Sequence, residues 1–334
     1  MKRWTLADVA ALDNLMAAAR KARKKKSRRP DVEEFFLHME SNILKLHGDL
    51  LDERWLPGKY RTFEIREPKR RLISAAPFAD RVVHHALCNC LQPSLEKSFI
   101  AHSFSCQVGK GTHAARERVR KLVNRHRYVL KCDVRKFFDS IDHGCLLERL
   151  RVVIECDGVF RLAKRIVAGH AATPGCGLPI GNLTSQLWGN LMLNEMDHWI
   201  TEDLRIGAYA RYTDDFLLFS DDTAILWSAW EGIIAKLADI RLQLAAPKSR
   251  LLNSSEGVPF CGFRFFPGLR PRILGATKRR FEQRKGRLMK SGAGLAEVSK
   301  AVFAWYQFSK EGNTYGLRKC YGQPRSFKAS SLTI

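Results

Sequence analysis

YARYTDDFLLFS, residues 209–220, is the stretch that decides the fold. Aromatic and apolar residues lie on both sides of two adjacent acids, Asp214 and Asp215. Two short apolar runs separated by a turn predict a β-hairpin with the two carboxylates at its tip. Neighbouring carboxylates repel each other unless a positive charge lies between them. Taken alone, the pair also fits a plain exposed turn, where Asp is common.

A third carboxylate ends an earlier apolar run. YVLKCD, residues 128–133, predicts a buried strand that finishes at Asp133. If this strand lies beside the hairpin, three carboxylates converge on one point. Mg²⁺ prefers such hard oxygen ligands, and two ions about 3.5–4 Å apart stabilise the attacking and leaving oxygens of a phosphoryl displacement. The sequence therefore predicts a site for two Mg²⁺ ions, with Mn²⁺ as an alternative, and nucleotidyl transfer as its chemistry.

The composition indicates a folded protein with a polyanionic partner. Of 334 residues, 57 are Lys or Arg and 34 are Asp or Glu, which gives a net charge of +23, while a hydrophobic content of 45% excludes a disordered basic chain. Two basic segments stand out: RKARKKKSRR, from Arg20 to Arg29, and the stretch from Arg270 to Lys290. Each fits either a solvated surface or a contact with nucleic-acid phosphates.

The cysteines and the hydropathy of the sequence indicate the cellular compartment of the protein. The nine cysteines form no C-x-x-C pair, and no apolar run reaches the length of a membrane span or a signal peptide. We therefore expect reduced thiols and a cytoplasmic protein.

Other patterns predict the remaining elements. We expect helices at 5–19, 31–51 and 81–95, a β-hairpin at 60–76 that turns at Glu67 and Pro68, a turn followed by a long helix at 177–200, and a helical subdomain from about 270.

Six segments, in this order, resemble the motifs of reverse transcriptases. They are PKRRLISAAPFADRVVHHAL (68–87), LKCDVRKFFDSIDH (130–143), GLPIGNLTSQLWGNLML (177–193), RYTDDFLLF (211–219), PKSRLL (247–252) and FCGFRF (260–265). The resemblance implies an α+β right-hand polymerase fold and an RNA-directed DNA polymerase. It divides the chain into an N-terminal helical basic extension (1–58), fingers (59–127, with part of 144–180), a palm (128–267) and a basic helical thumb (268–334).

The resemblance also assigns catalytic roles. Asp133, Asp214 and Asp215 match the metal-binding triad, joined by the backbone carbonyl of Val134. Phe138 matches the steric gate, a ring that leaves no room for a 2′-hydroxyl and so selects deoxynucleotides. Phe137 and Phe138 are adjacent and face different ways, so at least one of them belongs to the core.

Further residues match positions that face the nucleotide and the nucleic acid. Arg71 is the first candidate for the incoming triphosphate, because a guanidinium offers a fork of donors. The other candidates for dNTP binding are Lys69, Arg81, Ile180, Gly181, Gln186 and Lys248, the last facing the leaving pyrophosphate. Lys110 and the two basic segments are candidates for binding template and primer.

Residues 180–186, IGNLTSQ, resemble one subfamily in particular. I-G-x-x-x-S-Q is typical of the reverse transcriptases of diversity-generating retroelements, where most relatives have Q-G-x-x-x-S-P. This resemblance implies error-prone copying opposite template adenine, a structured template RNA, a small basic accessory protein that forms an oligomeric ring, and a bacterial or phage origin. Two alternatives stay open: a stand-alone group II intron-like or antiphage-defence reverse transcriptase, and a non-catalytic RNA-binding protein with a polymerase fold.

Overall fold

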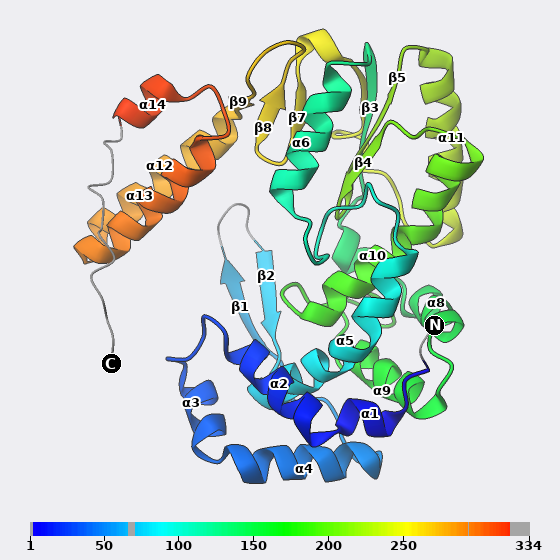
Figure 1. Ribbon diagram of the computed structural model, residues 1–334, viewed down its shortest axis with the longest axis vertical. Coiled ribbons are helices and arrows are strands. Elements are labelled where there is room, and N and C mark those ends of the chain that lie inside the picture. Colours follow the sequence, from blue (N-terminus) through cyan, green and yellow to red (C-terminus); the bar gives the residue numbers. More distant parts are fainter. Residues whose placement is uncertain (1–2, 66–70, 293, 321–334) are drawn as a thin grey trace.

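The computed structural model describes residues 3–65, 71–292 and 294–320 of the chain (Figure 1). Helices and sheets are mixed. A layer of helices from the N-terminal half lies at the bottom of the view, a four-stranded sheet lies above it, and a pair of long C-terminal helices stands to one side (Figure 1).

The four-stranded sheet is antiparallel, in the order β4-β5-β3-β6. Its strands are β3 (Tyr128–Asp133), β4 (Tyr209–Tyr212), β5 (Asp215–Ser220) and β6 (Arg250–Asn253). Alternate residues of β3 and β5 enter two different hydrophobic clusters: Leu130 and Phe216 face one, Val129 and Leu217 the other. Because both faces are covered, these strands are almost continuously apolar. The predicted buried strand and the hairpin are both confirmed.

Helices supply the cover on each face. α11 (Thr223–Asp239) packs against β3 and β5 on one side, and α6 (Thr112–Val123) packs against β4 and the next sheet on the other. α10 (Leu183–His198) runs beneath the hairpin and continues as a π-helix (Trp199–Asp203). It contacts α5 (Phe78–Ser98), α8 (His143–Val153) and α11, so it ties the sheet to the helical layer. α7 (Phe137–Ser140) and α9 (Asp157–Ala168) complete this region.

The N-terminal helices differ from the prediction in two places. The helix expected at 5–19 is broken at Ala11 into α1 (Leu6–Ala10) and α2 (Leu12–Arg23), and the helix expected at 31–51 is broken at His38 into α3 (Pro30–Leu37) and α4 (Met39–Leu51). The breaks let each segment turn its own apolar side inward. α3 packs on α5, while α4 packs on α1 and α2. Periodicity alone could not locate these breaks, because the apolar residues recur at helical spacing across both.

A two-stranded hairpin projects from the helical layer toward the C-terminal helices (Figure 1). β1 (Arg61–Ile65) pairs antiparallel with β2 (Arg71–Ala75), as predicted. The expected turn at Glu67 and Pro68, with Lys69, lies outside the described residues.

The C-terminal region combines a small sheet with helices. β7 (Val258–Phe260), β8 (Phe263–Phe265) and β9 (Arg272–Ile273) form an antiparallel sheet after a 3₁₀ turn (Ser254–Glu256). α12 (Gly275–Lys290), α13 (Leu295–Ser309) and α14 (Tyr315–Cys320) follow. Phe281 stacks on Trp305 with ring centroids 4.4 Å apart, which joins α12 to α13. Within the described part of the chain, no helix is long and apolar enough to cross a membrane.

Candidate active site

Backbone pairing brings the three predicted carboxylates to one end of the sheet. Asp133, the last residue of β3, lies opposite Asp215, the first residue of β5. The N–H of Val134 donates to the carbonyl oxygen of Asp214 at 3.1 Å, which holds the β4–β5 turn against the end of β3. Tyr212 pairs with Asp215, so Thr213 and Asp214 form the turn and Asp215 already belongs to the strand.

Two lysines engage these carboxylates. Lys131 Nζ contacts Asp215 Oδ1, and Lys248 Nζ contacts Asp133 Oδ1. Burial raises the pKa of Asp215 to about 6; the nearby charge of Lys131 opposes this rise, and Asp133 and Asp214 add to it. The lysines therefore offset the mutual repulsion of the acids. Sequence reasoning missed Lys131, although a lysine inside an otherwise apolar strand is a usable signal.

The residues at this end of the sheet have the chemistry of a magnesium or manganese site. The donors are carboxylate and carbonyl oxygens, with no sulfur or imidazole among them, and hard divalent cations prefer such a set. Among the described residues, no group of three or more acidic, His or Cys side chains is already arranged around a common point. One carboxylate oxygen of Asp133 and one of Asp215 instead face Lys248 and Lys131. The Lys248 side chain is half exposed, whereas that of Lys131 is largely enclosed.

The two adjacent phenylalanines occupy different environments. Phe137 is buried, and Phe138 is half-buried with its ring centroid 5.2 Å from that of Phe137. α10 backs both rings at Gly189, where an added Cβ would lie 3.1 Å from Phe137 Cε1 and 3.2 Å from Phe138 Cε1. Phe137 is thus the core residue of the pair, and Phe138 keeps one side open.

The segment before α10 lies against the β1–β2 hairpin. Gly181 has a φ of 113°, which favours glycine, and an added Cβ there would meet the side chain of Ile73 in β2 at 3.8 Å. Asn182 Nδ2 donates to the hydroxyl of Tyr60 at 2.9 Å. In the sequence, Ile180 directly precedes Gly181, and the half-buried Gln186 lies in the first turn of α10.

The basic candidates near the hairpin are placed differently. Arg71 begins β2 opposite Ile65. Arg81 lies on α5, where its guanidinium pairs with Asp31 at 2.5 Å and covers the ring of Phe78, so it faces the N-terminal helices. Lys110 Nζ donates to the carbonyl oxygens of Ile100 and Ser103, at 3.2 and 2.9 Å, and braces its own loop.

The two basic segments lie mostly at the surface. Residues 20–29 end α2 and continue into the turn before α3, and most of their side chains are exposed. α12, in the second segment, lines a groove of about 680 Å³ together with α13 and the end of β1. Arg280, Arg284 and Arg287 lie on this groove beside Phe281 and Trp305.

Comparison with known proteins identifies the family. The family model described as "Reverse transcriptase (RNA-dependent DNA polymerase)" matches residues 65–265. Protein YkfC of Escherichia coli (strain K12) is 25% identical over 277 residues, which cover 66% of this chain and 71% of that protein. The group II intron-encoded protein LtrA of Lactococcus lactis subsp. cremoris is 25% identical over 174 residues, covering 49% of this chain but 29% of LtrA.

A solved structure supports the fold. Telomerase from Candida albicans, in complex with a fragment of telomeric RNA, superposes with a TM-score of 0.50 at 12% identity and covers 76% of this chain and 53% of that one. This likeness confirms the predicted α+β right-hand polymerase fold. The match over residues 65–265 confirms the predicted RNA-directed DNA polymerase, and the chain belongs to the reverse transcriptase family.

Proposed function

We propose that the chain copies an RNA template into DNA at the site formed by Asp133, Asp214 and Asp215. The observation that carries this proposal is that backbone pairing places these acids next to one another, at the end of β3 and at the β4–β5 turn, inside the segment that matches the family. Two Mg²⁺ ions would be held by the three carboxylates and the Val134 carbonyl, and when bound they stabilise the charge on the attacking and leaving oxygens.

The chain's own residues supply the rest of the site. Phe138 presents its open side to the sugar and excludes a 2′-hydroxyl. Arg71, with Lys69, neutralises the triphosphate. Lys248 moves from Asp133 to bind the departing pyrophosphate. The groove along α12 and α13 holds the template–primer duplex, because it combines arginines for phosphates with aromatic rings.

Primer extension tests the proposal. The full chain is supplied with a DNA primer annealed to an RNA template, the four dNTPs and Mg²⁺, with a chelator-treated reaction as control. We expect primer elongation that requires both template and Mg²⁺. If no primer, template or partner supports incorporation while the chain still binds RNA, the non-catalytic RNA-binding alternative is favoured.

Truncating the steric gate should relax sugar selection. Phe138→Ala is expected to raise the efficiency of rNTP over dNTP incorporation by about one to two orders of magnitude, since a steric change in a pocket supplies discrimination of that size. Competition between rNTP and dNTP on one template measures the ratio. Phe137→Ala is the matched control, because that neighbouring ring is in the core and should affect stability rather than the ratio. If Phe138→Ala leaves the ratio of rNTP to dNTP incorporation unchanged, Phe138 is not the steric gate.

We further propose that the chain is the reverse transcriptase of a diversity-generating retroelement. Ile180, Gly181 and Gln186 support this subtype, and the Gly181 backbone lies close to Ile73 of the β1–β2 hairpin, which we assign to the fingers. An apolar Ile180 offers the templating base pair no hydrogen bond, so the site checks base-pair geometry less strictly. The expected partners are a structured template RNA and a small basic accessory protein in an oligomeric ring.

The subtype proposal predicts a change in fidelity. Ile180→Gln is expected to lower misincorporation opposite template adenine by about tenfold, the worth of roughly one net hydrogen bond. Sequencing of cDNA made on a defined RNA template, counted by template base, measures it. Ile225→Gln, at an exposed isoleucine of α11, is the control. Uniformly low error in the wild-type chain, unaffected by Ile180→Gln, contradicts the subtype.

An intron-type reverse transcriptase is the second candidate. The observation in its favour is the similarity to LtrA, a group II intron-encoded protein, although this chain spans less than a third of LtrA. An enzyme of this type should copy accurately opposite all four template bases, so the same sequencing experiment separates the two candidates.

A further inference from the structure

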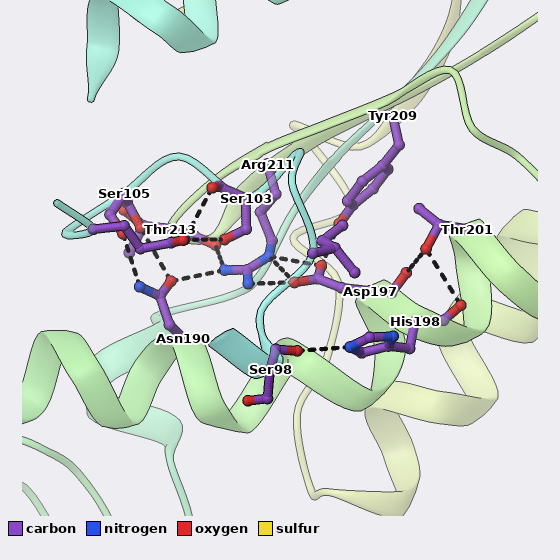
Figure 2. Close-up of polar contacts among 12 residues, drawn as sticks. Ser98, Ser103, Ser105, Asn190, Asp197, His198, Thr201, Tyr209, Arg211 and Thr213 are labelled. Carbon is purple, nitrogen blue, oxygen red and sulfur yellow. Dashed lines mark hydrogen bonds and ion pairs between the residues drawn. The ribbon is translucent and has the colours of Figure 1, made fainter. Parts of the chain in front are cut away.

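A fully buried ion pair lies directly beneath the β4–β5 turn (Figure 2). Arg211, in β4, and Asp197, at the end of α10, both have side chains without solvent exposure. Arg211 Nε donates to Asp197 Oδ1 at 2.8 Å, and a second guanidinium nitrogen contacts Oδ2. The hydroxyl of Tyr209 donates to Asp197 Oδ1 at 2.7 Å. The carboxylate is therefore saturated and fixed on α10.

The remaining terminal nitrogen of Arg211 reaches the turn itself. Nη1 donates to the carbonyl oxygen of Thr213 at 3.1 Å. That carbonyl belongs to the peptide bond between Thr213 and Asp214, so its direction sets the orientation of the Asp214 backbone. Thr213 has a φ of 59°, a conformation that a β-branched residue rarely adopts. The strained peptide is thus held from below by a partly buried hydrogen bond from the Arg211 guanidinium.

Asn190 holds the guanidinium from a second side (Figure 2). Its Oδ1 accepts from Arg211 Nη1 at 3.1 Å and from Ser105 Oγ at 3.1 Å, and its Nδ2 donates to the Ser105 carbonyl at 2.8 Å. Asn190 and Asp197 both belong to α10. Only a planar fork of donors can satisfy the carboxylate, the amide and the Thr213 carbonyl together.

We propose that Arg211 is a positioning residue for the metal site: it orients the Thr213–Asp214 peptide and thereby sets the affinity of the site for divalent cations. The inference rests on the proposed metal-binding role of Asp214. Arg211 contacts no substrate and acts through the turn, as residues behind a metal ligand commonly do. A purely structural role would require only the ion pair with Asp197 and would leave cation affinity unchanged.

Arg211→Lys tests this role, because lysine keeps the charge beside Asp197 and loses the fork that reaches Thr213. Mn²⁺ binding to the full chain, followed by electron paramagnetic resonance without nucleic acid, is the main readout. We expect Mn²⁺ affinity to fall about tenfold, the usual size of such effects. In primer extension, kcat should fall while KM for dTTP stays close to the wild-type value.

Tyr209→Phe is the matched control. It removes a hydrogen bond to the same Asp197 carboxylate and leaves the turn untouched. We expect a lower Tm and wild-type Mn²⁺ affinity. Equal loss of Mn²⁺ affinity in Tyr209→Phe and Arg211→Lys, or wild-type affinity in a folded Arg211→Lys, overturns the positioning role.

A second variant decides the matter if Arg211→Lys does not fold. Asn190→Ala removes one of the acceptors that fix the guanidinium, and it should weaken Mn²⁺ binding in the same direction by a smaller factor. No change in Mn²⁺ affinity in that variant overturns the inference. A wild-type chain that binds no Mn²⁺ contradicts the metal site itself, a result distinct from equal binding by wild type and variants.

Discussion

Replacing Asp214 with Asn is expected to lower dNTP incorporation by about a thousandfold, equivalent to about 4 kcal/mol in the activation free energy. Asn has nearly the same shape as Asp and is equally at home in a turn, so the hairpin should persist. What is lost is one negative charge among three carboxylates that, in our proposal, hold both ions. Steady-state primer extension on an RNA template at saturating Mg²⁺ measures the change.

Asp239→Asn is the matched control for this experiment. Asp239 is an exposed acid at the end of α11, so its substitution changes the net charge equally without touching the site. It should retain wild-type activity, and both variants should unfold at the wild-type temperature within a few degrees. An Asp214→Asn enzyme that keeps more than a tenth of wild-type activity would contradict the catalytic assignment.

The strands that carry the acids could be predicted from sequence because their signals are local. YVLKCD and YARYTDDFLLFS are short apolar runs that end at acids, and an apolar run of this length next to a turn predicts a buried strand. Their pairing was only a condition of the proposed two-metal site, because the local patterns do not say which strands lie side by side. The structure places Asp133 opposite Asp215, so that condition is met.

What escaped prediction depends on contacts between distant segments. The breaks at Ala11 and His38 are set by how four helices share one core, and no local pattern marks them. Lys131 and Lys248 approach acids on neighbouring strands only after the sheet has formed. For the Asp197–Arg211 pair, the sequence shows a charged residue within each of two apolar segments. It does not show that these two residues pair with each other.

One helix connects the separate parts of the site. The residues before α10 meet the β1–β2 hairpin, Gly189 backs the ring of Phe138, and Asn190 with Asp197 holds Arg211 beneath the β4–β5 turn. In our proposal, sugar selection, template contact and metal placement therefore share α10 as a common support. On that proposal, a shift of this helix would disturb all three functions at once.

The Asp197–Arg211 pair should also make a large contribution to stability. Asp197→Ala is expected to lower the free energy of unfolding by about 3–5 kcal/mol, because it leaves the Arg211 guanidinium buried without a counter-ion. A loss of that size is a large part of the free energy of unfolding of a typical domain, which is about 5–15 kcal/mol. Urea denaturation followed by circular dichroism measures it.

Two further variants show whether the cost comes from the unpaired charge. Glu195, an exposed residue on the same helix as Asp197, pairs with Arg149 of α8, and Glu195→Ala should cost less than about 1 kcal/mol. The double variant Asp197→Leu with Arg211→Met removes both buried charges and should recover much of the stability lost in Asp197→Ala, since apolar pairs of similar volume can replace a buried ion pair. That double variant should nevertheless bind Mn²⁺ weakly, because no donor then reaches the Thr213 carbonyl. Recovered stability without recovered cation affinity would separate the two roles of this pair, whereas recovery of both would assign it to stability alone.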